Sequence, residues 1–145
     1  MHSTNYQDTF IAVAPDCPAT QGTIPKEAAT PSAARIAYRL IQAQPYGLTS
    51  DDVLFAVFAE RQRLPPTDRE AARAKFFARP QACLRASDLG KRYGWGIHSD
   101  ASGKVALVGV ETDAYRMLLG GRVPGHPEQK VTVKYAMRSR RTKST

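Results

Sequence analysis

The segment SDLGKRYGWGIHSDASGKVALVGVE, residues 87–111, decides the fold class. Residues 93–98 are rich in aromatic side chains, and residues 104–110 are apolar from their second member onward. Between these runs, Asp100 and Gly103 occupy the first and fourth positions of a four-residue turn, where a type I turn prefers them. Two such runs joined by a short turn predict an antiparallel β-hairpin of residues 93–98 and 104–110.

Three helices are expected upstream of this hairpin, and proline marks the limits of the first. Pro31 opens that helix with Thr30 as its N-cap. Pro45 ends it, because the residue before a proline is disfavoured in the α region. Thr49 and Asp52 form a capping box that begins the second helix.

The second helix continues through residues 53–59, which are apolar on all sides and predict the most buried helix of the protein. Thr67 and Glu70 predict a second capping box at the start of a third helix. Residues 111–119 predict a short helix that ends at two glycines. Residues 9–14 form a short apolar run with β-branched members, which predicts a strand in the same sheet as the hairpin.

These elements predict an α+β domain with a small antiparallel or mixed sheet of about three strands, packed with three to four helices. At 145 residues the chain fits one domain. We expect residues 1–129 to form that domain and residues 130–145 to form a basic C-terminal tail. Residues 130–137 are compatible with either a strand or a helix.

The net charge of +8 is concentrated near the C-terminus. Residues 130–145 contain six lysines and arginines and no acid, so the remainder of the chain carries only +2. A basic segment suggests an anionic partner, and we expect nucleic acid or an acidic protein surface. The cations of this tail that we expect to make the contact are Lys134, Arg138, Arg140, Arg141 and Lys143.

Cys17 and Cys83 are too few and too far apart to predict a disulfide scaffold or a zinc site. The first residues are polar and contain no apolar core of a secretory signal. The longest apolar run, residues 53–59, is much shorter than the roughly 20 residues that span a bilayer. We therefore expect a cytoplasmic protein without a membrane segment, and the sequence leaves its oligomeric state open.

Cations and aromatic residues also gather in and before the hairpin, and this mixture can bind an anion or stack a flat ring. The alternative interpretation is that the tryptophan belongs to the core and the cations form a solvated face. The candidate ligand-binding residues are Arg85, Lys91, Arg92, Trp95 and His98.

The sequence gives less support to other kinds of chemical site. His98 and Asp100 have the spacing of a metal or acid–base pair on one strand, but Asp100 is also the residue that begins the turn. Cys83 has arginines nearby, which favour a thiolate, but free cysteine is also commonly buried. Asp51, Asp52 and Glu60 are typical of helix caps and surface positions. The sequence contains no phosphate loop or serine-nucleophile motif, and we expect no metal and no cofactor.

Four blocks of the sequence, spread over nearly the whole chain, resemble a family of small microbial proteins known as a domain of unknown function. They are MHSTNYQDTFIAVAPDCP, PYGLTSDDVLFAVFAER, PQACLRASDLGKRYGWGIHSD and AMRSRR. The resemblance implies a stand-alone single domain and provides no catalytic residues to transfer. The last block implies that the basic tail is partly a feature of the family.

Two classes of function follow from these observations. The first is a non-enzymatic binding module that contacts an anionic partner through the tail and the face at residues 85–98. The second is a small-ligand-binding protein or enzyme with an anion-accepting pocket near Arg85, Trp95 and His98. Because no catalytic set is recognisable, the sequence favours the first class.

Overall fold

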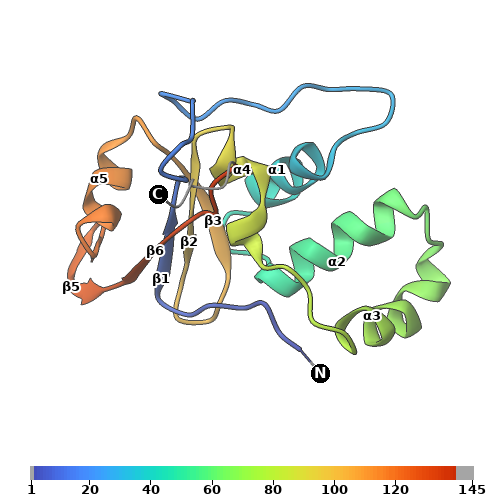
Figure 1. Ribbon diagram of the computed structural model, residues 1–145. Coiled ribbons are helices and arrows are strands. Elements are labelled where there is room, and N and C mark those ends of the chain that lie inside the picture. Colours follow the sequence, from blue (N-terminus) through green and yellow to red (C-terminus); the bar gives the residue numbers. More distant parts are fainter. Residues whose placement is uncertain (1, 140–145) are drawn as a thin grey trace, which may run out of the picture.

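The computed structural model describes residues 2–139, and the predicted hairpin lies at its centre (Figure 1). Strands β2 (Trp95–Ser99) and β3 (Val105–Gly109) pair antiparallel. In the turn, the N–H of Gly103 donates to the carbonyl of Asp100 at 3.0 Å, and Gly103 adopts a φ of +80°. The prediction of an α+β fold built on this hairpin is therefore confirmed.

The hairpin belongs to a four-stranded mixed sheet of order β3-β2-β1-β6. Strand β1 (Thr9–Ala12) pairs antiparallel with β2, as predicted, and pairs parallel with β6 (Thr132–Tyr135) on its other side. The pairing continues past β6, where the N–H of Ala136 donates to the carbonyl of Ala12 at 2.8 Å. The first part of the predicted tail is thus a strand in the sheet.

This finding resolves the alternatives for residues 130–137 and changes the domain description. The predicted boundary at residue 129 would separate β6 from the sheet that it joins. The physical reason for β6 is burial, because Val131 and Ala136 at its two ends lie in the protein core. Of the predicted tail contacts, Lys134 and Arg138 are described, whereas Arg140, Arg141 and Lys143 lie outside the described residues.

One face of the sheet is covered by α1 (Ala33–Ala43) and the start of α2 (Ser50–Arg61), as Figure 1 shows. Helix α1 begins two residues later than predicted, because Ser32, not Thr30, accepts the capping hydrogen bond. Helix α2 begins with the predicted capping box. No residue from 50 to 59 is exposed, as the unbroken apolar pattern predicts.

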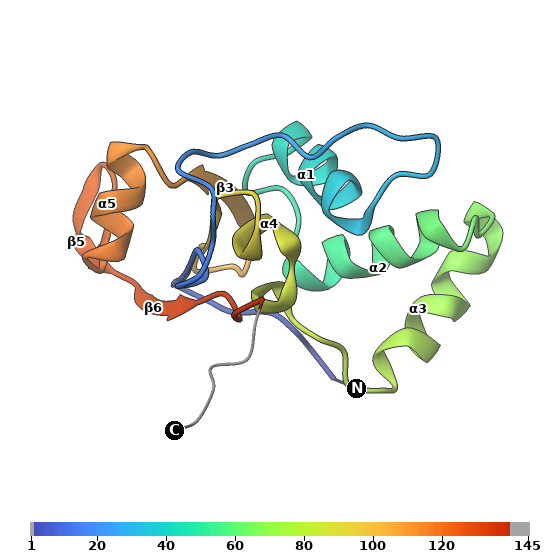
Figure 2. The same ribbon diagram turned by 45° about the horizontal axis from the view of Figure 1, so that its top comes forward.

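Helix α3 (Arg69–Phe77) packs beside α2 at the end of the molecule farthest from the sheet (Figure 2). The predicted capping box of Thr67 and Glu70 is absent, and this prediction was wrong. Residues Pro66–Asp68 form a 3₁₀ turn instead, and α3 starts after it without a side-chain cap. A short 3₁₀ turn, η2 (Leu84–Ala86), and one turn of helix, α4 (Asp88–Lys91), lead from there to β2.

The opposite face of the sheet is covered by α5 (Asp113–Leu119), which packs on Phe10 through Tyr115 with the two rings edge to face. Strands β4 (Arg122–Val123) and β5 (His126–Lys130) then form a separate two-stranded sheet. We expected about three strands overall, so the sequence underestimated the strand count.

Candidate functional site

The residues proposed as a ligand-binding face do not all come together, because β2 separates two of them. Trp95 and His98 are three positions apart on one strand, and side chains alternate between the two faces of a sheet. Trp95 packs with the core on the side of α1, whereas the ring of His98 contacts Tyr46. No single pocket on one face of the sheet can use both rings.

The side chain of Trp95 is already in contact with other parts of the chain. Its indole N–H donates to the carbonyl of Thr23 at 2.9 Å, and its ring lies 5.6 Å from that of Tyr38. At Gly22 an added Cβ would approach the indole ring to 2.8 Å, and at Gly94, where φ is +78°, it would lie 2.5 Å from a backbone carbonyl. The loop before α1 therefore packs closely against the indole ring and against the backbone at Gly94.

His98 is buried, with 4% of its surface exposed. Its Nδ1 and the hydroxyl oxygen of Tyr46 are 2.8 Å apart and share a hydrogen bond. Burial lowers the pKa of His98, and the carboxylates of Asp100 and Asp8 only partly oppose this effect. Burial likewise raises the pKa of Tyr46. Both groups are therefore uncharged at neutral pH, and their contact holds the loop after α1 against the hairpin.

We expect the free energy of unfolding to fall as the pH drops below about 6.5, the ordinary histidine pKa. Because the folded-state pKa of His98 is lower, the unfolded chain takes up this proton first, and the contribution of neutral His98 is lost between the two values. Urea denaturation between pH 5 and 8 should show a slope that is weaker in His98→Gln.

His126→Asn is the matched control, because it replaces an exposed histidine that lies outside the contact between His98 and Tyr46. Asp52 does not interfere, because it titrates at lower pH. Burial alone would raise the pKa of Asp52, but hydrogen bonds from Thr49 and Arg73 lower it. Equal slopes in the parent protein and His98→Gln would contradict the assignment.

Arg85 lies beside the C-terminal strand rather than beside Trp95. Its Nε donates to the carbonyl of Tyr135 at 2.8 Å, and its own carbonyl accepts the N–H of Met137 at 2.8 Å. Ala136 packs against Gly90, where an added Cβ would lie 2.9 Å from the alanine methyl. The chain after β6 therefore runs along η2 and α4, which Figure 2 shows from above.

This contact gathers basic residues that are distant in the sequence. Arg138 is exposed immediately after the hydrogen-bonded Met137. Arg92 and Ser139 line one surface hollow of about 510 Å³ together with Asp16, whose carboxylate accepts the N–H of Ser139. Asp88 lies 3.7 Å from Arg92 and partly neutralises it. Lys91, the remaining predicted cation, is half-buried on α4. We name the following four residues the basic edge: Arg85, Arg92, Lys134 and Arg138.

Tyr6 connects the basic edge to Cys83. Its hydroxyl lies 3.4 Å from the thiol sulfur, and Lys134 Nζ lies 5.8 Å from the centroid of its ring. The hydrogen bond with Cys83 and then burial raise the pKa of Tyr6, and Arg85 only partly opposes them. The phenol therefore stays protonated at neutral pH, and its half-buried ring lies beside two cations.

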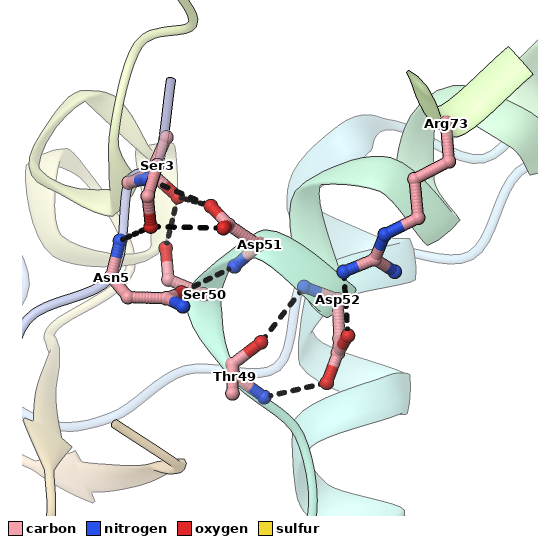
Figure 3. Close-up of polar contacts among 8 residues, drawn as sticks. Ser3, Asn5, Thr49, Ser50, Asp51, Asp52 and Arg73 are labelled. Carbon is pink, nitrogen blue, oxygen red and sulfur yellow. Dashed lines mark hydrogen bonds and ion pairs between the residues drawn. The ribbon is translucent and has the colours of Figure 1, made fainter. Parts of the chain in front are cut away.

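A second polar cluster, which the sequence interpretation missed, lies at the start of α2 (Figure 3). Asp51 is 4% exposed, and its carboxylate accepts hydrogen bonds from the Thr4 N–H at 2.7 Å, the Thr4 hydroxyl at 2.7 Å and the Ser3 hydroxyl at 2.9 Å. Its N–H donates to Asn5 Oδ1 at 2.9 Å. The carboxylate thus anchors the N-terminal segment and has its hydrogen bonds satisfied inside the protein.

The sequence contained one signal for this anchor, which is that α2 has no polar face. A helix whose body is apolar all round lies largely inside the protein, and part of its first turn is then covered as well: Ser50 and Asp51 are buried, whereas Asp52 is partly exposed. Asp51 and Ser50 had therefore to find partners within the protein, and Thr4 supplies one for each.

Two general features complete the description of residues 2–139. No three histidine, cysteine, aspartate or glutamate side chains in this part of the chain are grouped as metal ligands would be. None of its helices has the length and apolar character that crossing a membrane requires.

Comparison with known proteins gives a family and no assigned activity. No curated protein matches the chain, and no solved structure matches it. A family model described as "Family of unknown function (DUF6157)" matches residues 1–142 of the 145. This match covers nearly the whole sequence, and the chain therefore belongs to that family of unknown function.

Proposed function

We propose that this protein is a non-enzymatic, cytoplasmic binding module that contacts the phosphate backbone of nucleic acid through the basic edge. The observation that carries the proposal is the pair of hydrogen bonds between Arg85 and the chain around Ala136. These bonds hold cations from η2, α4 and β6 in one region, although they come from two distant parts of the sequence. Lysine and arginine side chains bind phosphates and release their counterions, which drives association.

The surroundings of the basic edge support a nucleic-acid ligand. Tyr135 is 47% exposed, and the half-buried ring of Tyr6 lies next to Lys134. Exposed tyrosine rings beside cations can stack unpaired bases without sequence preference. Arg140, Arg141 and Lys143, which follow in the sequence, add three further cations to this part of the chain.

The proposal predicts that the triple variant Arg92→Gln/Lys134→Gln/Arg138→Gln binds nucleic acid more weakly than the parent protein. Arg85 is left in place because it connects η2 to β6. Affinity for a 20-nucleotide single strand and for a 20-base-pair duplex is measured by fluorescence anisotropy over a range of salt concentrations. For duplex DNA, loss of three phosphate contacts should reduce the slope of log K against log[salt] by up to about 2.7.

A matched control removes the same charge elsewhere, since Lys26, Arg61 and Arg63 are exposed and lie outside the basic edge. Lys26→Gln/Arg61→Gln/Arg63→Gln should keep most of the affinity. Equal loss in both triple variants, or no binding by the parent protein at low salt, would contradict the proposal. Poly-glutamate is tested in parallel, and tighter binding to it than to either nucleic acid would identify an acidic protein surface as the partner instead.

A further inference from the structure

A second surface, formed between α2 and α3, is independent of the basic edge. It is a groove of about 700 Å³ with an apolar floor that includes Phe58, Leu64, Ala72 and Phe76. Sites that accept small molecules or apolar side chains commonly have volumes of about 300–1,000 Å³. The groove is therefore large enough for the anchoring side chains of a bound segment.

The floor of the groove is the open side of an aromatic cluster. Phe77 and Phe55 are 1% and 5% exposed and form its closed side, whereas Phe58 and Phe76 are only half-buried. The rings of Phe58 and Phe76 lie 4.8 Å apart and make one continuous apolar surface. Figure 2 shows the two helices that carry these rings, with α3 beside α2 at the end of the molecule away from the sheet.

The rim of the groove is basic. Lys75 and Arg79 line it, and among the described residues that line it none is acidic. Residues 50–81, which include both helices of the hairpin, contain six lysines and arginines and five acids, so the excess of positive charge belongs to the rim itself. Complementary charge selects partners and repels those of like charge.

We infer that this groove binds an acidic segment of another protein, with large apolar side chains in the aromatic floor and carboxylates beside Lys75 and Arg79. An amphipathic helix in an apolar groove is a recurring mode of peptide recognition. The charge argues against the two other occupants. The chain's own segment at residues 140–145 contains three cations and no acid, and a second copy would bring a net charge of +8.

Selection from a library of random 12-residue peptides displayed on phage tests this inference with the full-length protein. The selected peptides should be enriched in aspartate or glutamate and in leucine, phenylalanine or tryptophan. A fluorescein-labelled copy of the best peptide should bind Lys75→Glu/Arg79→Glu about tenfold or more weakly than the parent protein. Phe58→Ala should weaken binding by a similar factor, as the loss of an aromatic anchor does.

Arg61→Glu/Arg63→Glu is the matched control, because it changes the charge equally at exposed positions that do not line the groove. This variant and Arg92→Gln/Lys134→Gln/Arg138→Gln should both keep the peptide affinity. Circular dichroism melts establish that each variant is folded. Absence of selected peptides, selection of neutral or basic ones, or equal loss in the control would overturn the inference. Concentration-dependent dimerisation that Lys75→Glu/Arg79→Glu abolishes would also overturn it, in favour of a second copy.

Discussion

Replacing Phe55 with alanine should lower the free energy of unfolding by about 3–5 kcal/mol, the usual range for a phenylalanine deleted from a packed core. Phe55 is 5% exposed on α2, and its ring lies within 6.2 Å of the Phe58 ring and 5.8 Å of the Phe76 ring. The guanidinium of Arg73 lies 5.8 Å from the centroid of the same ring. Removing the ring leaves a cavity at the junction of α2 and α3 and takes away the surface on which α3 packs.

Urea denaturation monitored by circular dichroism measures this loss, and Phe58→Ala provides the comparison. Phe58 is in the same cluster but half-buried, so its removal should cost only about 1–2 kcal/mol. A loss below about 1 kcal/mol for Phe55→Ala, or equal losses for the two variants, would contradict the central position of Phe55. A larger loss of unfolding free energy in Phe55→Ala than in Phe58→Ala would also show that Phe55 is on the closed side of the aromatic cluster and Phe58 on the open side that forms the groove.

The elements that the sequence predicted well are those whose signals are local. The turn between β2 and β3 depends on Asp100 and Gly103, which are three residues apart, and the start of α2 depends on Thr49 and Asp52. Such contacts form between neighbours in the chain, so a short pattern contains all the partners. The predicted cap of α3 failed, although its pattern was similar, because Pro66 begins a 3₁₀ turn one turn earlier.

The strands that escaped prediction lack this local information. Strand β6 pairs with β1, more than a hundred residues away in the sequence, and the neighbouring cations directed our interpretation toward a tail. Strands β4 and β5 form a ribbon in which every residue of His126–Lys130 is exposed, so no buried face gives a periodic pattern. Neither long-range pairing nor a fully polar strand produces the alternation by which strands are recognised.

The lack of long-range information in the sequence also explains why the predicted ligand-binding residues do not form one site. The predicted hairpin itself implies that Trp95 and His98 face opposite sides of the sheet, because they are an odd number of residues apart. Their actual partners are Tyr38 and Tyr46, which belong to α1 and to the loop after it. Both lie far from the hairpin in the sequence, so no local pattern indicates these contacts. The association of Arg85 with the residues after β6 likewise depends on a strand that the sequence left undecided.

The buried carboxylate at the start of α2 gives the second large expected effect, since Asp51→Asn should cost about 2–4 kcal/mol of unfolding free energy. The asparagine has nearly the same shape, so it leaves no cavity, but it lacks the negative charge and keeps one acceptor oxygen instead of two. Two of the three donors belong to the buried Thr4, and both bind Oδ1 of the carboxylate, so in the variant they share a neutral oxygen instead of a charged one. Hydrogen bonds to a charged group contribute about 1.5–3 kcal/mol each, whereas those between neutral groups contribute about 0.5–1.5 kcal/mol.

The neighbouring Asp52 makes the comparison direct. Asp52→Asn removes the same charge from the same helix turn, but Asp52 is partly exposed and holds only the cap and an ion pair with Arg73. It should cost about 1 kcal/mol or less. Hydrogen exchange adds a local readout, because loss of the anchor should speed exchange of the Thr4 amide in Asp51→Asn and leave it protected in Asp52→Asn. Equal destabilisation, or a Thr4 amide that stays protected in both, would show that Asp51 is an ordinary first-turn acid and that the N-terminal segment is held by other contacts.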